Sequence, residues 1–179
     1  VTVDRYLMDT PDKGDGSLTG YNVWKWIDYD NYNYPYAGAG SPDFSTNWII
    51  LRYAEIYLND AEARLETGDV EGARKAVNMI RQRVGLPDLT ESDPEKLREL
   101  IRKERRIEFA FEEQRFYDVR RWKIGPETQT TLHGVRFVSP TEFKVTKTDI
   151  RTWNDRLYLT PVPHDEIVRS SVLKQNPGY

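Results

Sequence analysis

Aromatic side chains crowd into one short stretch near the beginning of the chain, and flat rings of this kind can bind sugars. The stretch contains Tyr21, Trp24, Trp26, Tyr29, Tyr32, Tyr34 and Tyr36. Trp24 and Trp26 are two residues apart, as are the last three tyrosines, so in an extended segment their rings project from one side. An exposed ring face can stack on the apolar C–H face of a pyranose, while nearby Asp and Asn side chains bond its hydroxyls.

The same stretch has a second interpretation, in which the rings clamp the segment onto a helical core as a lid. Aromatic side chains chiefly contribute buried area, which favours this interpretation for any single ring, and both stay open for the segment. Trp153 lies in a polar loop and is predicted to be a further exposed aromatic residue. The candidate glycan-binding residues are therefore Trp24, Trp26, Tyr29, Tyr32, Tyr34, Tyr36 and Trp153.

Charged side chains form a second pattern, in which Glu104 falls on the apolar stripe of a predicted helix. A carboxylate in that position needs a cationic partner, and a guanidinium can supply two parallel hydrogen bonds. We interpret the pattern as a structural ion-pair network of Glu104, Arg105, Arg106, Glu108, Arg115, Arg120 and Arg121. The alternative is a general acid/base site formed by Glu104 and Glu108 on adjacent helical turns, although packed charge networks are the commoner cause of such patterns.

Metal and cofactor sites are not predicted. The chain has no cysteine, and its two histidines, His133 and His164, stand alone without the spacing of metal ligands. The oxygen-rich segment 28–33 fails as a calcium loop because Tyr32 and Asn33 occupy positions that need an oxygen ligand and a glycine. A glycoside hydrolase would need two carboxylates about 5–10 Å apart across a cleft, and no such pair stands out.

The elements that must position these side chains are three successive helices within residues 46–125. The first begins near Trp48 and carries an apolar stripe through Leu51, Leu58 and Leu65, and the second follows Gly68 and Asp69 as its antiparallel partner. Ala61 and Ala73 have the twelve-residue separation of the small residues in a tetratricopeptide-like pair. Ser92 or Asp93 caps a long third helix, whose stripe is Leu97, Leu100, Ile101, Ile107, Ala110 and Phe111.

The flanking parts differ in composition from the helical part. Residues 1–45 are loop-rich and aromatic, and residues 126–179 predict a hairpin of strands 135–138 and 142–146 around a turn at Ser139 and Pro140. A further short strand is predicted at 156–160, a helical turn at 164–168 and an irregular tail thereafter. The expected fold is mainly α, with a tetratricopeptide-like helix pair, a long third helix, a hairpin and long loops, all in one domain.

Composition limits the function classes. The 179 residues carry a formal net charge of −3, which argues against a general affinity for nucleic acid. No apolar run approaches the roughly 18 residues of a membrane span. The chain starts at Val1 without an initiator methionine or a signal peptide, so we expect a mature piece or an excised fragment.

Five motifs in a fixed order complete the pattern. They are WIILRYAE at 48–55, NMIRQRVGLP at 78–87, ERRIEFAFE at 104–112, RFYDVRRW at 115–122 and the terminal QNPGY at 175–179. Together they resemble the C-terminal part of the SusD/RagB family. The resemblance implies a non-catalytic lipoprotein on the cell surface of Bacteroidota, which binds starch-like or other glycans and covers a TonB-dependent, SusC-like outer-membrane transporter.

The resemblance leaves two points open. The N-terminal part of the family, with its lipid-anchored cysteine and several helical repeats, is absent from this sequence, and we expect it to be a partner of this segment. The family's helices serve as scaffold, so no binding residue transfers by motif. A function from a different class also stays open, in which the helix pair docks on the transporter as a protein-interaction module without binding sugar.

Overall fold

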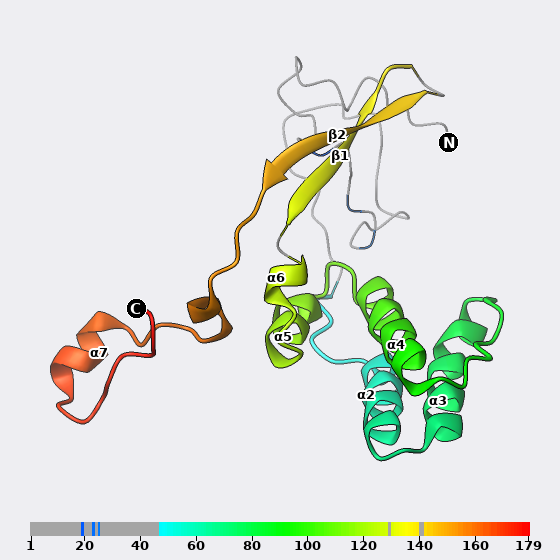
Figure 1. The fold of residues 1–179 in the computed structure, drawn as a ribbon, viewed down its shortest axis with the longest axis horizontal. Helices are drawn as coiled ribbons and strands as arrows, with labels where there is room; N and C mark the ends of the chain where they lie inside the picture. Colours follow the sequence, from blue (N-terminus) through cyan, green and yellow to red (C-terminus); the bar gives the residue numbers. More distant parts are fainter. Residues whose placement is uncertain (1–18, 20–22, 24, 26–46, 129, 140–141) are drawn as a thin grey trace. The chain divides into compact units, whose positions relative to one another are not determined.

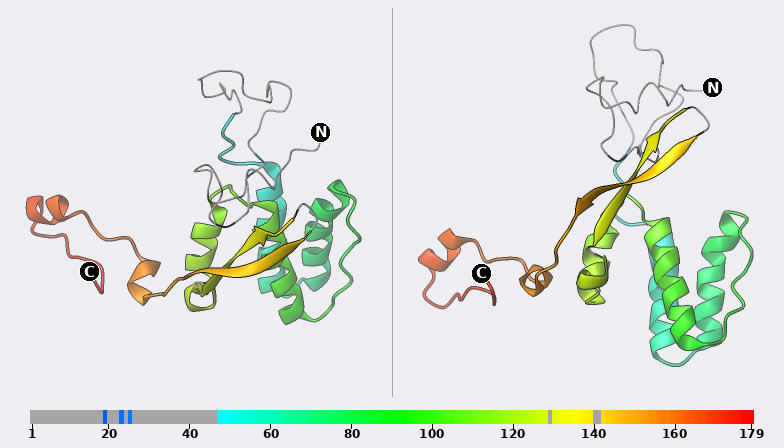
Figure 2. Two further views of the ribbon diagram at one scale, coloured as in Figure 1. Left: turned by 90° about the horizontal axis from the view of Figure 1, so that it is seen from above. Right: turned by 45° about the horizontal axis from the view of Figure 1, so that its top comes forward.

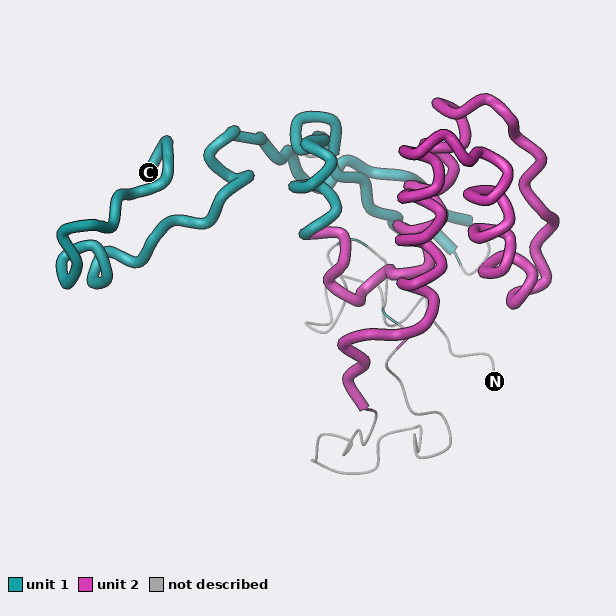
Figure 3. The backbone as a smooth tube through the Cα atoms, turned by 90° about the horizontal axis from the view of Figure 1, so that it is seen from below, with its two compact units in different colours: residues 1–24, 117–179 teal, residues 25–116 magenta. Residues whose placement is uncertain are grey.

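The structure is a computed structural model that describes residues 19, 23, 25, 47–128, 130–139 and 142–179. The chain divides into two compact units, one of residues 1–24 and 117–179 and the other of residues 25–116 (Figure 3). Six α-helices and one two-stranded hairpin occur in the described residues, which confirms the mainly helical prediction. That the whole chain forms one domain stays a prediction.

Three helices make up most of the described part of the unit of residues 25–116. They are α2 (Tyr53–Glu66), α3 (Val70–Arg83) and α4 (Pro94–Glu108), and α3 and α4 both pack against α2 (Figures 1 and 2). Gly68, with a φ of +87°, ends the turn after α2 in a conformation that favours glycine. Asp69 then caps α3 by accepting a hydrogen bond from the Gly72 backbone N–H at 2.8 Å. The expected antiparallel pair is therefore present.

The core of this unit lies where the three helices meet. Ala61 of α2 and Ala73 of α3 are both fully buried, as their twelve-residue separation predicts. Leu58 and Leu97, from α2 and α4, are likewise sealed from solvent. Asp93 caps α4 by accepting hydrogen bonds from the backbone N–H groups of Glu95 and Lys96. These local signals were all readable from the sequence.

The structure differs from the predicted apolar stripes at two places, the start of the first helix and the end of the third. Residue 52 is extended and α2 begins only at Tyr53, so Leu51, predicted to lie on the helical stripe, is 75% exposed. The Arg52 guanidinium is held by carboxylates near the end of α4, which fixes the chain before α2 in this extended form. At the other end Ile107 and Phe111 are exposed, and Phe109 just beyond α4 is buried in their place.

The second unit begins within α5 (Gln114–Arg121), which is followed by α6 (Gly125–Thr128). Strands β1 (Thr131–Phe137) and β2 (Phe143–Ile150) then pair antiparallel, with Val135 opposite Val145. The predicted hairpin is confirmed, with longer strands than expected. The Val135 backbone N–H also donates to the Thr19 carbonyl at 2.7 Å, so Thr19 lies against β1.

Side chains near the end of the chain form hydrogen bonds to the backbone of earlier residues. The predicted strand at 156–160 is wrong, because Asn154 accepts from the Arg156 N–H and caps the 3-10 helix η2 (Asp155–Tyr158) instead. The expected helical turn is present as α7 (His164–Arg169). Gln175 then bonds both backbone groups of Val162, and the Tyr179 hydroxyl donates to the Leu159 carbonyl at 3.0 Å.

Candidate functional site

Glu104 is a buried carboxylate whose charge is neutralised by an arginine of a neighbouring helix. It is 7% exposed on α4, and Arg81 of α3 donates to its Oε2 at 2.7 Å. Arg81 was not among the arginines that the sequence suggested as partners. The pair is 23 residues apart in the chain, so only the packing of α3 on α4 brings the two side chains together.

Arg105 and Arg106, which were predicted to join the same network, have different surroundings. Arg105 is 3% exposed, donates to Asn59 Oδ1 at 2.7 Å and lies over the Phe109 ring, with its guanidinium carbon 5.2 Å from the centroid. Arg106 is exposed. Arg105 therefore joins α4 to α2, which suits a scaffold role.

The largest cluster of charges lies where α4 ends. Arg52 donates to both Glu112 carboxylate oxygens, at 2.7 and 2.9 Å, and its guanidinium also contacts the Glu108 carboxylate. Arg83 of α3 donates to Glu108 as well, at 2.7 Å. Lys25 forms an ion pair with Glu112. Sequence reasoning missed Lys25, Arg52 and Arg83, because their partners lie far away along the chain.

Ion pairing keeps Glu112 charged despite its burial. Its side chain is 6% exposed, and this burial by itself opposes ionisation. Hydrogen bonds from Arg52 and Lys25 outweigh that effect and hold the pKa of the Glu112 carboxyl below its ordinary value. A carboxylate kept ionised by bonded cations is unsuited to proton donation near neutral pH, so Glu112 serves to join chain segments.

The remaining arginines of the predicted network lie within α5. Arg121 donates to Asp118 Oδ1 at 2.9 Å and stacks on Trp122, and Arg120 lies over Trp153, whose ring centroid is 5.9 Å away. Arg115 is half-buried. The predicted network is thus divided, with Glu104, Arg105, Arg106, Glu108 and Arg115 in the unit of residues 25–116, and Arg120 and Arg121 in the other.

Trp153 is half-buried, whereas the sequence predicted an exposed ring. One side packs on Gly125, where a Cβ atom would lie 2.1 Å from Trp153 Cε2, so only glycine permits this approach. The Tyr158 ring lies 4.8 Å away, centroid to centroid. The indole Nε1 is buried and has no hydrogen-bond partner among the described residues. At most part of one ring face is available to a sugar.

The other aromatic candidates, Trp24, Trp26, Tyr29, Tyr32, Tyr34 and Tyr36, lie outside the described residues. Within the described part, no cluster of His, Cys, Asp and Glu side chains could hold a metal ion, and His133 and His164 are both exposed. No helix among these residues is both long and apolar enough to cross a membrane.

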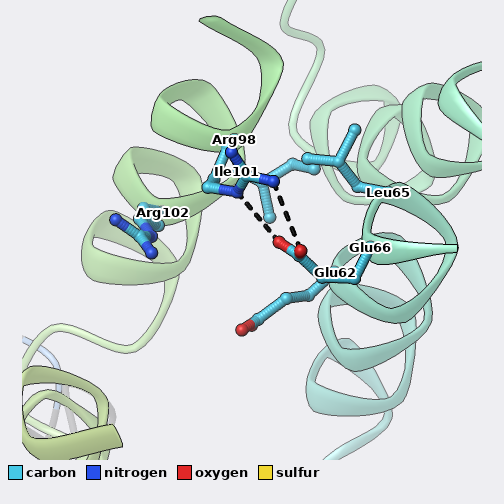
Figure 4. Close-up of a pocket in the computed structure, with 6 residues that line it drawn as sticks. All are labelled: Glu62, Leu65, Glu66, Arg98, Ile101 and Arg102. Atoms are coloured by element: carbon cyan, nitrogen blue, oxygen red, sulfur yellow. Dashed lines mark hydrogen bonds and ion pairs between the residues drawn. The ribbon is translucent and has the colours of Figure 1, made fainter. Parts of the chain in front are cut away.

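A small hollow lies between α2 and α4 (Figure 4). Its lining consists of Glu62, Leu65, Glu66, Arg98, Ile101 and Arg102. Arg98 donates to Glu66 Oε1 at 2.9 Å across the hollow, so the charges of these two lining residues neutralise one another. The hydrogen bonds that Arg98 donates to Glu66 and Glu95 raise the pKa of Arg98 above its ordinary value. The hollow suits a salt-bridged helix contact better than a ligand.

An apolar surface lies at the beginning of α2. Leu51, Tyr53 and Ile56 are 75%, 69% and 59% exposed, and Ile49 and Ile50 beside them are exposed as well. Five large apolar side chains in eight residues make an exposed apolar patch, and larger patches of this kind mark sites of contact with proteins, membranes or ligands. We call these five residues the α2 apolar patch.

Comparison with known proteins decides the family. The model that describes the SusD family matches residues 4–179, almost the whole chain. The chain belongs to the SusD family. SusD-like protein P2 of Formosa agariphila is 38% identical over 155 residues, which cover 80% of this chain and 28% of that protein. SusD-like protein P25 of the same organism is 32% identical over 172 residues, which cover 84% of this chain and 31% of that protein.

A solved structure shows the same SusD fold. The crystal structure of a SusD-like protein from Bacteroides fragilis NCTC 9343 matches the entire chain with a TM-score of 0.90 and 98% identity. The match covers a C-terminal portion, 34% of that solved chain. The present chain therefore spans about a third of the length of its relatives, and the resemblance found in its motifs is confirmed.

Membership in the SusD family also bears on the acid/base alternative. Proteins of the SusD family are non-catalytic. Glu104 and Glu108 agree with this assignment, because each is bonded by an arginine from a neighbouring segment, Glu104 by Arg81 and Glu108 by Arg52 and Arg83. These contacts are those of a scaffold.

Proposed function

We propose that the protein captures glycans at the bacterial cell surface and delivers them to a TonB-dependent outer-membrane transporter. The observation that carries the proposal is the match of the SusD family model to residues 4–179. Like other SusD lipoproteins, the full-length protein would be lipid-anchored in the outer membrane and face outward. Starch-like and other polysaccharides are the substrate class that this assignment implies.

We infer that the residues that recognise the glycan lie outside the helical core. In the unit of residues 25–116 the described charged side chains on facing helices are bonded to one another, as in Arg81–Glu104 and Arg98–Glu66. Such paired groups hold helices together and leave few polar atoms to bind sugar hydroxyls. The rings of Trp24, Trp26, Tyr29, Tyr32, Tyr34 and Tyr36 are therefore the proposed stacking platform, with Trp153 as a secondary candidate.

Isothermal titration of the full-length protein with maltoheptaose, cellohexaose and xylohexaose tests this function. Binding to at least one of these oligosaccharides, with weaker binding by Trp24→Ala, supports it. Leu173→Ala offers a control far from the aromatic stretch in sequence, and it should bind as the wild type does. Absence of heat with every glycan would count against glycan capture.

A second candidate function rests on the α2 apolar patch. Its exposed side chains suit a contact with another helical segment, and the relatives are about three times as long as this chain. We propose that the missing N-terminal part of the same protein covers the patch, and that the transporter is the alternative occupant. Co-purification of a barrel transporter by a protein without affinity for sugar would favour the interaction role alone.

A further inference from the structure

The last residues of the chain bond back to the segment just before α7 and close a loop (Figure 1). Gln175 bonds both backbone groups of Val162, because it accepts from the N–H at 2.8 Å and donates to the carbonyl at 2.9 Å. The Tyr179 hydroxyl donates to the Leu159 carbonyl at 3.0 Å. Residues 156–179 therefore form a closed loop, which we call the terminal loop.

The closure depends on the residue types of the terminal QNPGY motif. Asn176 adds a further bond, to the Thr160 carbonyl at 2.6 Å. Gly178 has a φ of +89°, and a Cβ atom there would lie 2.8 Å from the Arg156 Cβ, so glycine suits this position. The Arg156 guanidinium lies over the Tyr179 ring, 5.2 Å from its centroid. The motif thus fixes the shape of the terminal loop.

The terminal loop has no core of its own. None of residues 156–179, all of which the structure describes, is buried. The helix within the loop, α7, has only six residues and buries none of them. A helix this short is unstable in water unless it packs against other structure. The loop therefore has a defined backbone, but the described part of the chain does not supply the packing that such a helix needs.

Apolar side chains of the terminal loop face solvent. Leu159, Val168 and Val172 are 48%, 71% and 84% exposed. Burying such side chains is favourable, and exposed apolar groups gathered on one segment mark sites of contact. An ordered loop that lacks a core and carries exposed apolar side chains indicates that another surface covers it.

The length of the relatives indicates which surface this is. The match to the SusD-like protein of Bacteroides fragilis covers a C-terminal 34% of that solved chain, so about two thirds of it have no counterpart here. A surface in the same polypeptide is present at high effective concentration, which suits a loop that needs permanent cover. A transporter or a second copy would leave the loop uncovered whenever the two proteins separate.

We propose that the terminal loop docks on the missing N-terminal part of the same protein through Leu159, Val168 and Val172. The QNPGY motif holds the loop in shape for this contact. The inference does not rest on glycan capture, and its test is done without sugar. It also concerns a surface separate from the α2 apolar patch, in the other compact unit.

The test measures the reactivity of the Val172→Cys thiol towards a maleimide in the full-length protein. Cysteine is a small apolar residue, so the substitution preserves the contact. Mass spectrometry reads the label in the tryptic peptide 170–174, which Arg169 and Lys174 delimit. Native labelling should be about 100-fold slower than labelling in denaturing urea. Lys75→Cys is the control, because Lys75 is 75% exposed on α3 and should label nearly as fast as in urea.

The outcomes distinguish the possible occupants. Protection of Val172→Cys that does not depend on protein concentration supports docking within one polypeptide, and Val168→Cys, read in peptide 157–169, should repeat it. Labelling as fast as in urea would overturn the proposal, and protection that appears only with a TonB-dependent transporter would assign the loop to the transporter. Protection that rises with protein concentration would assign it to a second copy and also overturn the proposal.

A second pair of variants tests the role of the motif. Gln175→Ala, combined with Val172→Cys, removes both bonds to Val162 and should speed labelling about tenfold. Glu166→Ala is the control in the same loop, because it removes only a surface ion pair with Arg169 and should leave the labelling rate unchanged. A rate that Gln175→Ala does not change would overturn the role assigned to the motif.

Discussion

Arg81 neutralises Glu104, a carboxylate that lies deep in the three-helix packing. Replacing Arg81 with methionine would leave this carboxylate buried without its cation. Removing one partner of a buried pair costs about 3 kcal/mol, since the remaining charge stays desolvated. We expect Arg81→Met to lower the free energy of unfolding by about that amount in urea titrations.

Two further variants make this prediction specific. Arg106 is exposed, so Arg106→Met should unfold at nearly the wild-type urea concentration. The double variant Arg81→Met with Glu104→Leu removes both charges and should recover much of the loss, because an apolar pair needs no compensation. A single variant as stable as the wild type would show that the ion pair contributes nothing.

Glu112 gives the cluster at the end of α4 a defined response to acid. Its pKa is lowered in the folded chain, because the hydrogen bonds from Arg52 and Lys25 outweigh the effect of burial. A lowered pKa contributes stability above the ordinary value of 4.5, and that contribution is lost as the pH falls through the folded value. We expect Glu112→Gln to be less stable than the wild type at pH 7.

The difference between Glu112→Gln and the wild type should shrink as the pH falls below about 4.5, where the unfolded chain begins to bind a proton at this carboxyl, and should vanish below the lower pKa of the folded chain. Urea unfolding at pH 7, 5 and 3 measures it. A difference that stays constant across this range would contradict the assigned titration. Glu113→Gln, at an exposed neighbour, is the control that should unfold at nearly the wild-type urea concentration at pH 7.

The sequence indicated which residues needed a partner, but it did not indicate which residues those partners are. Glu104 was recognisable because a carboxylate interrupted an apolar stripe with helical spacing. Its partner Arg81 and the Arg52–Glu112 contact join positions 23 and 60 residues apart, and their pairing depends on how helices pack. Trp153 was misjudged for a similar reason, since the surface that covers it comes from Gly125, 28 positions earlier in the chain.

At the scale of elements, the close packing of α2 and α3 depends on small residues. Ala61 and Ala73 are both fully buried in the same core. A larger side chain at Ala73 must push the helices apart or take a strained rotamer. We expect Ala73→Leu to lower the free energy of unfolding by about 1–3 kcal/mol in urea titrations.

Ala63 provides the comparison for Ala73→Leu, since it belongs to α2 and is exposed. Leucine is nearly as good a helix former as alanine, so Ala63→Leu should change stability by only about 0.5 kcal/mol or less. If Ala73→Leu proved equally harmless, the small residues would not be needed for the helix pair.

Sequence signals predicted helix boundaries well where the residues that set the boundary lie close together in the chain. Gly68 with Asp69, and Asp93 with Pro94, mark helix boundaries through bonds to residues within three positions, so the sequence contains the whole signal. The start of α2 was missed because Arg52 is fixed in an extended form by the end of α4. The strand expected at 156–160 was missed because Asn154 caps a 3-10 helix.

At the scale of the whole molecule, this chain spans about a third of the length of the SusD-like proteins that it matches. The family assignment was accessible from the sequence because five motifs follow one another in order. The glycan was not, because stacking recognises a ring face that many sugars share. Charged side chains on the described helices bond to one another, as in Arg81–Glu104 and Arg98–Glu66, which fits a scaffold. The aromatic stretch stays the proposed glycan-binding platform.

The most direct measurement of this account is the titration of the full-length protein and two variants with maltoheptaose, cellohexaose and xylohexaose. Truncating an aromatic anchor costs about 2 kcal/mol, so the Trp24→Ala/Trp26→Ala variant should weaken Kd more than tenfold for the glycan that the wild type binds. Trp153→Ala, at a half-buried ring, should weaken it less. Equal affinity of the wild type and the Trp24→Ala/Trp26→Ala variant would contradict the claim that glycan recognition lies in the aromatic stretch.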